Sequence, residues 1–173
     1  MDFRELVKRR RSVRRYLRRP VEEEVIGRIF EAMNTAPSAG DLQAYEVVRV
    51  EEESNRRLLA LAAGDQHFIA EAPVVLVFFA DPRRSARKYR ERGEDLYSVQ
   101  DATIGCSYAQ LAATAEGLGS CWVGAMYDDE VRSILGAPGH LRPVAILTLG
   151  YPDESPSPTP RRSVQDLVRR ETF

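Results

Sequence analysis

The stretch Pro73–Ala80, PVVLVFFA, decides the fold. It is an unbroken run of branched and aromatic apolar residues, which is typical of a strand buried on both faces rather than of a half-exposed one. We therefore expect it to lie in the centre of a sheet that helices cover on both sides. Three further segments have strand-like patterns: Tyr45–Val50, Ser120–Ala125 and Pro143–Gly150.

Helical patterns alternate with these strands. Asp2 is expected to cap a short first helix, and a second helix follows Pro20 with an apolar face that extends to Met33. Asp101 is expected to cap a long helix rich in small residues that stops at Gly117. Shorter helices are predicted at Glu53–Ala63 and Asp129–Leu135. The alternation predicts a single domain, residues 1–173, of the α+β class with α/β-type layers.

Two segments do not fit this alternation. Asp81–Asp95 is polar and highly charged, so we expect a surface excursion or a mobile helix. Pro152–Pro160 is too rich in proline for regular structure and is expected to form an extended arm. Together with the small-residue helix, the arm indicates close contact between subunits.

The composition is that of an ordinary globular protein, with 43% hydrophobic and 29% charged residues. No apolar run is long enough to span a membrane, and the charged N-terminus does not resemble a signal peptide, so a cytoplasmic location is expected. Cys106 and Cys121 are predicted to be small buried residues. His67 and His140 are too few for a histidine metal site, and no metal is expected.

The basic residues are unevenly placed, with eight of them between Lys8 and Arg19 although the net charge is −1. Such a run suits nucleic acid, a membrane surface, a phosphate ligand or simply a solvated face. Arg161 and Arg162 form a second basic pair near the end of the chain. Two arginine groups and the Ser12 hydroxyl could enclose one phosphate, and no nucleophile motif is visible, so a phosphorylated cofactor with its own reactivity is favoured.

Four segments resemble the nitroreductase family and occur in the family's order: RRSVRRY (Arg10–Tyr16), APSAGDLQ (Ala36–Gln43), GLGSCWVGA (Gly117–Ala125) and LTLGYP (Leu147–Pro152). The resemblance implies a central mixed, mainly antiparallel sheet flanked by helices. It also implies a homodimer that exchanges its extended C-terminal arms, an FMN cofactor, and NADH or NADPH as electron donor.

The resemblance also implies the cofactor contacts. The first arginines and Ser12 would lie near the phosphate and ribityl oxygens, Arg14 near the pyrimidine edge, and the Pro37–Ala39 segment would reach the flavin of the other subunit. A main-chain N–H near Gly124 would face flavin N5, and Gln66 is a weaker candidate for the flavin edge. The full set of expected contacts is Arg10, Arg11, Ser12, Arg14, Pro37, Ser38, Ala39, Gln66, Trp122, Val123, Gly124, Arg161 and Arg162.

Trp122 is equally well explained as part of the core, since large aromatic residues dominate cores whatever the function. The second segment departs from the commoner family pattern: Asp41 replaces Asn, while Ala44 and Tyr45 replace Pro-Trp and Gln43 is retained. An Asp side chain cannot donate as an Asn amide does, so any ligand contact made by that Asn is in question.

The reaction implied is the transfer of a hydride from NAD(P)H through flavin N5 to an electron-poor small molecule such as a nitroaromatic or a quinone, with ping-pong kinetics. No side chain is expected to act as a catalytic acid or base. Two alternatives remain open: a flavin enzyme of the same scaffold with fragmenting or reductive dehalogenating chemistry, and an arginine-rich nucleic-acid-binding protein. The slightly negative net charge disfavours nucleic acid, and no membrane partner is expected.

Overall fold

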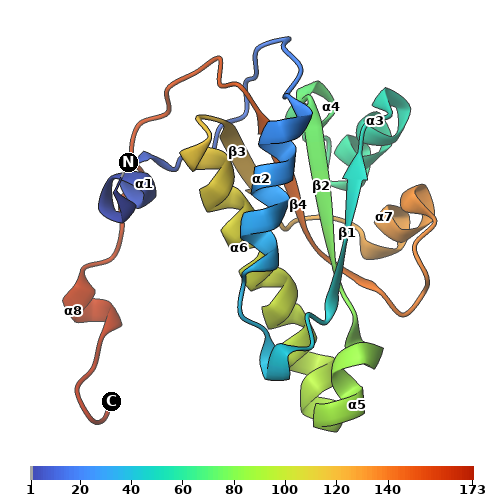
Figure 1. Ribbon diagram of the computed structural model, residues 1–173, viewed down its shortest axis with the longest axis vertical. Helices are drawn as coiled ribbons and strands as arrows, with labels where there is room; N and C mark the ends of the chain where they lie inside the picture. Colours follow the sequence, from blue (N-terminus) through green and yellow to red (C-terminus); the bar gives the residue numbers. More distant parts are fainter. Residues whose placement is uncertain (1) are drawn as a thin grey trace.

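The computed structural model describes residues 2–173 and contains a four-stranded sheet with helices on both faces (Figure 1). The strands lie in the order β1 (Tyr45–Val50), β2 (Val74–Ala80), β4 (Arg142–Gly150), β3 (Gly119–Val123). All three strand pairs are antiparallel, and a parallel bridge joins Ser12 to Ser120 outside them. The α+β class and the mainly antiparallel sheet are therefore confirmed.

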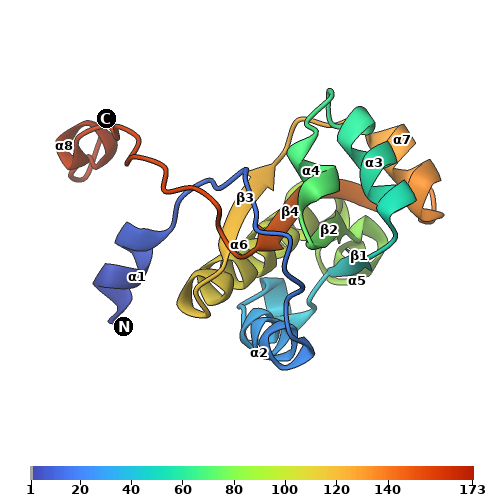
Figure 2. The same ribbon diagram turned by 90° about the horizontal axis from the view of Figure 1, so that it is seen from above.

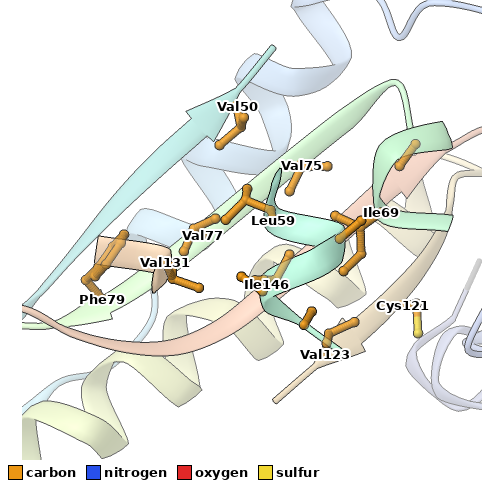
Figure 3. Packing of buried hydrophobic residues seen from close by; sticks show 14 of the residues in the cluster. Val50, Leu59, Ile69, Val75, Val77, Phe79, Cys121, Val123, Val131 and Ile146 are labelled. Atoms are coloured by element: carbon orange, nitrogen blue, oxygen red, sulfur yellow. The ribbon is translucent and has the colours of Figure 1, made fainter. Parts of the chain in front are cut away.

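Strand β2 lies at an inner position of the sheet, and every one of its residues is buried. Val75, Val77 and Phe79 point to one face, where they pack against helices α3 (Glu53–Ala62), α4 (Phe68–Glu71) and α7 (Asp128–Leu135), as Figure 3 shows. The alternate residues point to the opposite face. The apolar run thus predicted a central strand correctly, since a strand covered on both sides has no position for a polar side chain.

The opposite face of the sheet is covered by α2 (Glu23–Asn34) and α6 (Ser98–Ala115), which lie side by side in both views (Figures 1 and 2). Their apolar residues pack on the side chains of Leu76, Phe78 and Leu147. Each predicted helix and strand is present with ends shifted by only a few residues. No helix within residues 2–173 has the length and apolar character needed to cross a membrane.

Asp101 does not cap α6, so that prediction is wrong. The helix begins at Ser98 and follows directly on a π-helical turn, Gly93–Tyr97, so it has no free N-terminus at Asp101. Asp101 is only 2% exposed, and its two carboxylate oxygens accept the backbone N–H groups of Ala39 and Ala44 at 2.8 and 3.1 Å. The acidic side chain caps a turn of another segment rather than its own helix.

The charged segment Asp81–Asp95 forms a helix, α5 (Pro82–Arg92), which is one of the two predicted possibilities. Asp81 caps this helix by accepting a hydrogen bond from the Arg84 N–H at 3.0 Å, and Pro82 starts it. The backbone kinks at Arg90, where φ is +51°, and then enters the π-helical turn. The segment therefore packs against the start of α6 rather than extending into solvent.

Both ends of the chain lie away from the sheet. Helix α1 (Phe3–Arg9), capped by Asp2 as predicted, and the short helix α8 (Val164–Leu167) project to the same side in Figures 1 and 2. The stretch from Pro152 to Pro160 is without helix or strand, as the sequence predicts, apart from a bridge between Tyr16 and Pro152. Helix α8 was not predicted, because four residues are too few to show a period.

Candidate active site

The arginine-rich segment Arg10–Tyr16 lies along the outer edge of β3. The Val13 N–H donates to the Ser120 carbonyl at 2.8 Å, which continues the bridge between Ser12 and Ser120. Tyr16 is buried, and its hydroxyl lies 2.6 Å from both the Val13 carbonyl oxygen and the Thr148 hydroxyl. Burial raises the pKa of Tyr16 above its ordinary value, so the hydroxyl stays protonated and the segment stays anchored.

The chain that leaves β4 holds the same segment from its other side. One carboxylate oxygen of Glu154 accepts the backbone N–H groups of Arg14 and Arg15, at 2.5 and 3.1 Å. The Asp153 N–H donates to the Arg15 carbonyl at 2.9 Å. Glu154 was not among the predicted residues, and its place in a proline-rich stretch gave no local signal of this role. The result is a basic segment with a fixed backbone.

Arg10 and Arg161 come together from opposite ends of the chain. The pKa of Arg10 is lowered by burial and then by the positive charges of Arg161 and Arg11. All three line a cavity of about 420 Å³ whose other walls are Val7, Lys8, Pro158 and Thr159. None of the ion pairs formed within residues 2–173 involves these three arginines. Such a group of guanidinium ions without carboxylate partners is suited to an anionic ligand.

The remaining hydrogen bonds of these arginines go to main-chain or hydroxyl oxygens. Arg11 donates to the carbonyls of Lys8 and Arg10, and Arg161 donates to Thr159 and to the Pro160 carbonyl. Arg162 points elsewhere, with a hydrogen bond to the Asp166 carbonyl at 2.7 Å, and it does not line the cavity. Of the C-terminal pair, the structure therefore brings only Arg161 to Arg10.

Cys121 on β3 lies beside Ser12 and Arg14, and the sequence did not single it out for the site. Burial raises the pKa of its thiol, while the charge of Arg14 and a hydrogen bond with Ser12 act in the opposite direction. The Arg14 guanidinium also lies over the ring of Phe68, 5.7 Å from its centroid. Ser12, Arg14 and the middle of β3 are thus close neighbours, and α4 lies next to them.

Gly124 follows β3 at an open position. It is exposed, and a Cβ atom built on it would meet only the Trp122 indole nitrogen, at 3.7 Å. Its N–H meets no acceptor within residues 2–173. Val123 is buried towards α3 and α4, whereas the Trp122 side chain packs on the core beneath α2 and α6. The side chain of Trp122 therefore contributes to the core, so only its backbone could contact a bound ligand.

Gln66 lies in the turn between α3 and α4, where its side-chain amide donates to the Ala63 carbonyl at 2.7 Å. The turn is close to the segment after β3, since the Tyr127 N–H donates to the Ala62 carbonyl at 2.8 Å. Gln66 thus belongs to the neighbourhood of Phe68, which itself lies against Arg14.

Pro37, Ser38 and Ala39 lie at the other end of the molecule, between α2 and β1 and next to α5 (Figure 1). Ser38 accepts a hydrogen bond from the Gln43 N–H at 2.9 Å, and Ala39 donates to Asp101. Neither of these hydrogen bonds reaches the arginine segment. Within one chain, the expected contacts therefore form two separate groups.

Comparison with known proteins identifies the family of the whole chain. The model of the nitroreductase family matches residues 7–66 and 56–151, which include the whole sheet and the arginine segment. The chain belongs to the nitroreductase family. An NADH dehydrogenase of Thermus thermophilus is 33% identical over 97% of this chain and 95% of its own length. An FMN reductase [NAD(P)H] of Bacillus subtilis is 29% identical over 94% of this chain and 71% of its own.

A solved structure of similar fold is the NADPH:FMN oxidoreductase of Vibrio harveyi complexed with NAD+. Its sequence is 28% identical to that of this chain. The similarity covers 98% of this chain and 76% of the Vibrio harveyi chain, with a TM-score of 0.90. The similarity extends over the whole arrangement of sheet and helices rather than over a single motif.

Proposed function

We propose that this chain is an FMN-dependent oxidoreductase that takes electrons from NADH or NADPH and passes them to an electron-poor small molecule such as a nitroaromatic or a quinone. The observation that carries the proposal is the meeting of Arg10 and Arg161 on a cavity of about 420 Å³ with no carboxylate to neutralise them. Among the relatives, the Bacillus subtilis protein is an FMN reductase and the Vibrio harveyi protein is an NADPH:FMN oxidoreductase, which supports the same cofactor and donors here.

The residues present fit FMN. Its phosphate needs several cationic donors, and Arg10, Arg11 and Arg161 supply them around one cavity. The Ser120 hydroxyl, next to Ser12 on the bridge, is buried and has no hydrogen-bond partner in the described part of the chain. The flat ring needs an approach to backbone without side-chain obstruction, and Gly124 offers one with a free N–H.

Each group of residues has a distinct task. Arg10, Arg11 and Arg161 bind the phosphate, with Arg162 as a weaker second partner because it points away in the structure. Arg14 lies near the pyrimidine edge, where its positive charge favours the reduced state. When bound, FMN would supply the redox chemistry, the transfer of a hydride from NAD(P)H to the acceptor. The backbone of Trp122, Val123 and Gly124 orients the ring, and Gln66 lies at its edge.

We further propose a homodimer with two composite sites. The side of α6 that faces away from the sheet carries an apolar row at helical spacing, in which Tyr108 and Ala115 are exposed and Ile104 and Leu111 are half-buried. The C-terminal arm has no core of its own: Val164, Leu167 and Phe173 are exposed. Because apolar surface of this extent is unfavourable in water, a second copy is expected to cover it. In such a dimer, Pro37, Ser38 and Ala39 of one subunit would complete the site of the other.

The arrangement of the basic run argues against a nucleic-acid-binding protein. Arg19 pairs with Glu22 at 2.7 Å, Arg15 faces Asp153, and Glu154 holds the backbone of Arg14 and Arg15. Nucleic acid requires a continuous basic surface, whereas the second half of this run is partly neutralised and the chain has a net charge of −1. The proposal also includes that the protein forms a single domain, that it acts in the cytoplasm and that it needs no metal ion.

The purified protein gives the direct test. It should be yellow, release FMN on denaturation, and oxidise NADH or NADPH only when an acceptor is present, with the parallel reciprocal plots of ping-pong kinetics. A panel of nitroaromatics, quinones and free FMN would identify the acceptor class. A colourless protein that does not bind added FMN would contradict the proposal.

A further inference from the structure

The turn from Ala39 to Ala44, which follows the Pro37–Ala39 segment, has a backbone that needs outside support. Three of its residues have positive φ: Gly40 at +59°, Asp41 at +58° and Gln43 at +45°. Glycine adopts this region freely, but Asp41 and Gln43 do so at a cost, because their Cβ atoms crowd the backbone. Contacts with the rest of the protein must therefore hold the turn in this form.

Asp101 provides the main support. Its Oδ1 accepts the Ala39 N–H at 2.8 Å and its Oδ2 accepts the Ala44 N–H at 3.1 Å, so one carboxylate holds both ends of the turn. It is only 2% exposed, and no Arg, Lys or His within residues 2–173 pairs with it. A buried carboxylate is costly unless it is hydrogen-bonded, so its position on α6 is tied to these two N–H groups.

The turn is also confined from outside. A Cβ atom on Gly40 would lie 2.5 Å from the Lys88 amine and from the Tyr89 hydroxyl, both on α5. The Arg84 side chain donates to the Leu42 carbonyl. These contacts come from a surface helix with charged side chains, whereas Asp101 holds the turn from the protein interior. The turn is thus fixed between α5 and α6.

We infer that Asp101 is a positioning residue for the flavin site. Through the Ala39 and Ala44 N–H groups it orients the Pro37–Ala39 segment, which would complete the flavin site of the second subunit. The inference rests on the proposed function and adds to it a residue that does not itself touch the cofactor. It also gives a role to Ala44, whose N–H a proline at this position would lack.

The test compares Asp101→Asn with a matched control, Ser98→Ala, in the full-length protein. Ser98 is fully buried on the same helix, and its hydroxyl bonds only to the Glu94 carbonyl, at 3.0 Å, so its loss disturbs α6 without touching the turn. The Asn amide keeps the shape of Asp but can accept only one of the two N–H groups. FMN affinity, the visible circular dichroism of bound flavin and the thermal midpoint would be measured for both.

For Asp101→Asn we expect FMN affinity to fall by at least about tenfold, which corresponds to the loss of one hydrogen bond to a charged acceptor, with an altered flavin dichroism. Ser98→Ala should keep the FMN affinity and the flavin dichroism of the wild type, even if its thermal midpoint falls as much as that of Asp101→Asn. Equal affinity and dichroism in Asp101→Asn and the wild type would overturn the inference. A wild type that binds no FMN would instead refute the proposed function, and the inference with it.

A second measurement needs no variant, in case Asp101→Asn does not fold. Amide hydrogen exchange of the wild-type protein would be followed at Ala39 and Ala44 with and without FMN. If the turn positions the flavin-binding segment, FMN should slow exchange at both amides, because the bound state disfavours opening of the turn. Identical exchange rates in the two states would overturn the inference.

Discussion

The guanidinium of Arg10 lies near that of Arg161, which is in the last part of the chain, and the charge of Arg161 together with burial lowers the pKa of Arg10. Two like charges that approach without an intervening carboxylate are unfavourable unless an anion joins them. The folded chain therefore carries an electrostatic cost at this cavity that a phosphate would remove.

Arg10→Ala and Arg161→Ala should each weaken FMN binding by roughly tenfold to a hundredfold, because each removes a charge-assisted hydrogen bond to phosphate. Fluorescence titration with FMN measures the affinity. Arg57→Ala is the control, since Arg57 is exposed on α3 and pairs only with Glu53. Unchanged FMN affinity in both test variants would contradict the placement of the FMN phosphate in this cavity.

Arg14→Ala should lower the midpoint potential of the bound flavin and leave its phosphate anchored. The positive charge beside the pyrimidine edge favours the reduced cofactor, and a shift of about 30 mV corresponds to about 1.4 kcal/mol for a two-electron couple. Redox titration measures the potential. Arg15→Ala is the control, because Arg15 is the next residue in the sequence and pairs with Asp153. A potential equal to that of the wild type, with FMN still bound, would place Arg14 away from the ring.

Glu154→Ala should loosen the arginine segment, because the Glu154 carboxylate accepts the N–H groups of both Arg14 and Arg15. We expect a loss of about 1–2 kcal/mol in the free energy of unfolding, together with weaker FMN binding. Urea denaturation and FMN titration measure the two effects. Asp153→Ala removes only an exposed ion pair at 3.8 Å and should change the stability little. Equal behaviour of the two variants would show that Glu154 has no special role.

The buried thiols predict a loss of stability at alkaline pH. Burial raises the pKa of Cys106 well above its ordinary value, and it also raises the pKa of Cys121. Below about pH 8.5 the thiols are protonated in both the folded and the unfolded chain, so stability does not depend on them. Above that pH the unfolded chain releases these protons and the folded chain does not, so stability falls as pH rises towards the folded-state pKa.

Urea denaturation between about pH 7 and 10 measures this fall, to which each thiol contributes at most about 1.4 kcal/mol per pH unit. Cys106→Ala should reduce the slope and keep the remainder due to Cys121. A slope that does not change in Cys106→Ala would mean that the Cys106 thiol does not titrate differently in the two states.

Local sequence patterns were sufficient for the four strands and the longer helices, but not for the four-residue helices α4 and α8. Pro73–Ala80 predicted an inner strand because a strand covered on both sides is apolar throughout, and the structure confirms it. Asp101 was misinterpreted for the converse reason. An acidic residue before small ones has the local pattern of a helix cap, but its actual partners, Ala39 and Ala44, come from a distant part of the chain.

The sequence predicted the types of residue that form the candidate site better than it predicted the residues that hold them in place. The two arginine groups suggested one phosphate, and Arg10 and Arg161 do meet at one cavity. Arg162, at the adjacent position, points to Asp166 instead, and side-chain direction in an extended arm has no period to reveal it. Glu154 acts on residues nearly the whole chain away, so only the folded structure could identify it.

The central claim is an FMN site completed by a second subunit, and sedimentation velocity with detection at both protein and flavin wavelengths tests it most directly. Dimer formation and FMN binding should be linked, each strengthening the other, so dilution should release flavin as the dimer dissociates. We predict that flavin sediments with a species of twice the 19.5 kDa chain mass and is absent from the monomer. A 19.5 kDa monomer that retains tightly bound FMN would contradict the composite site.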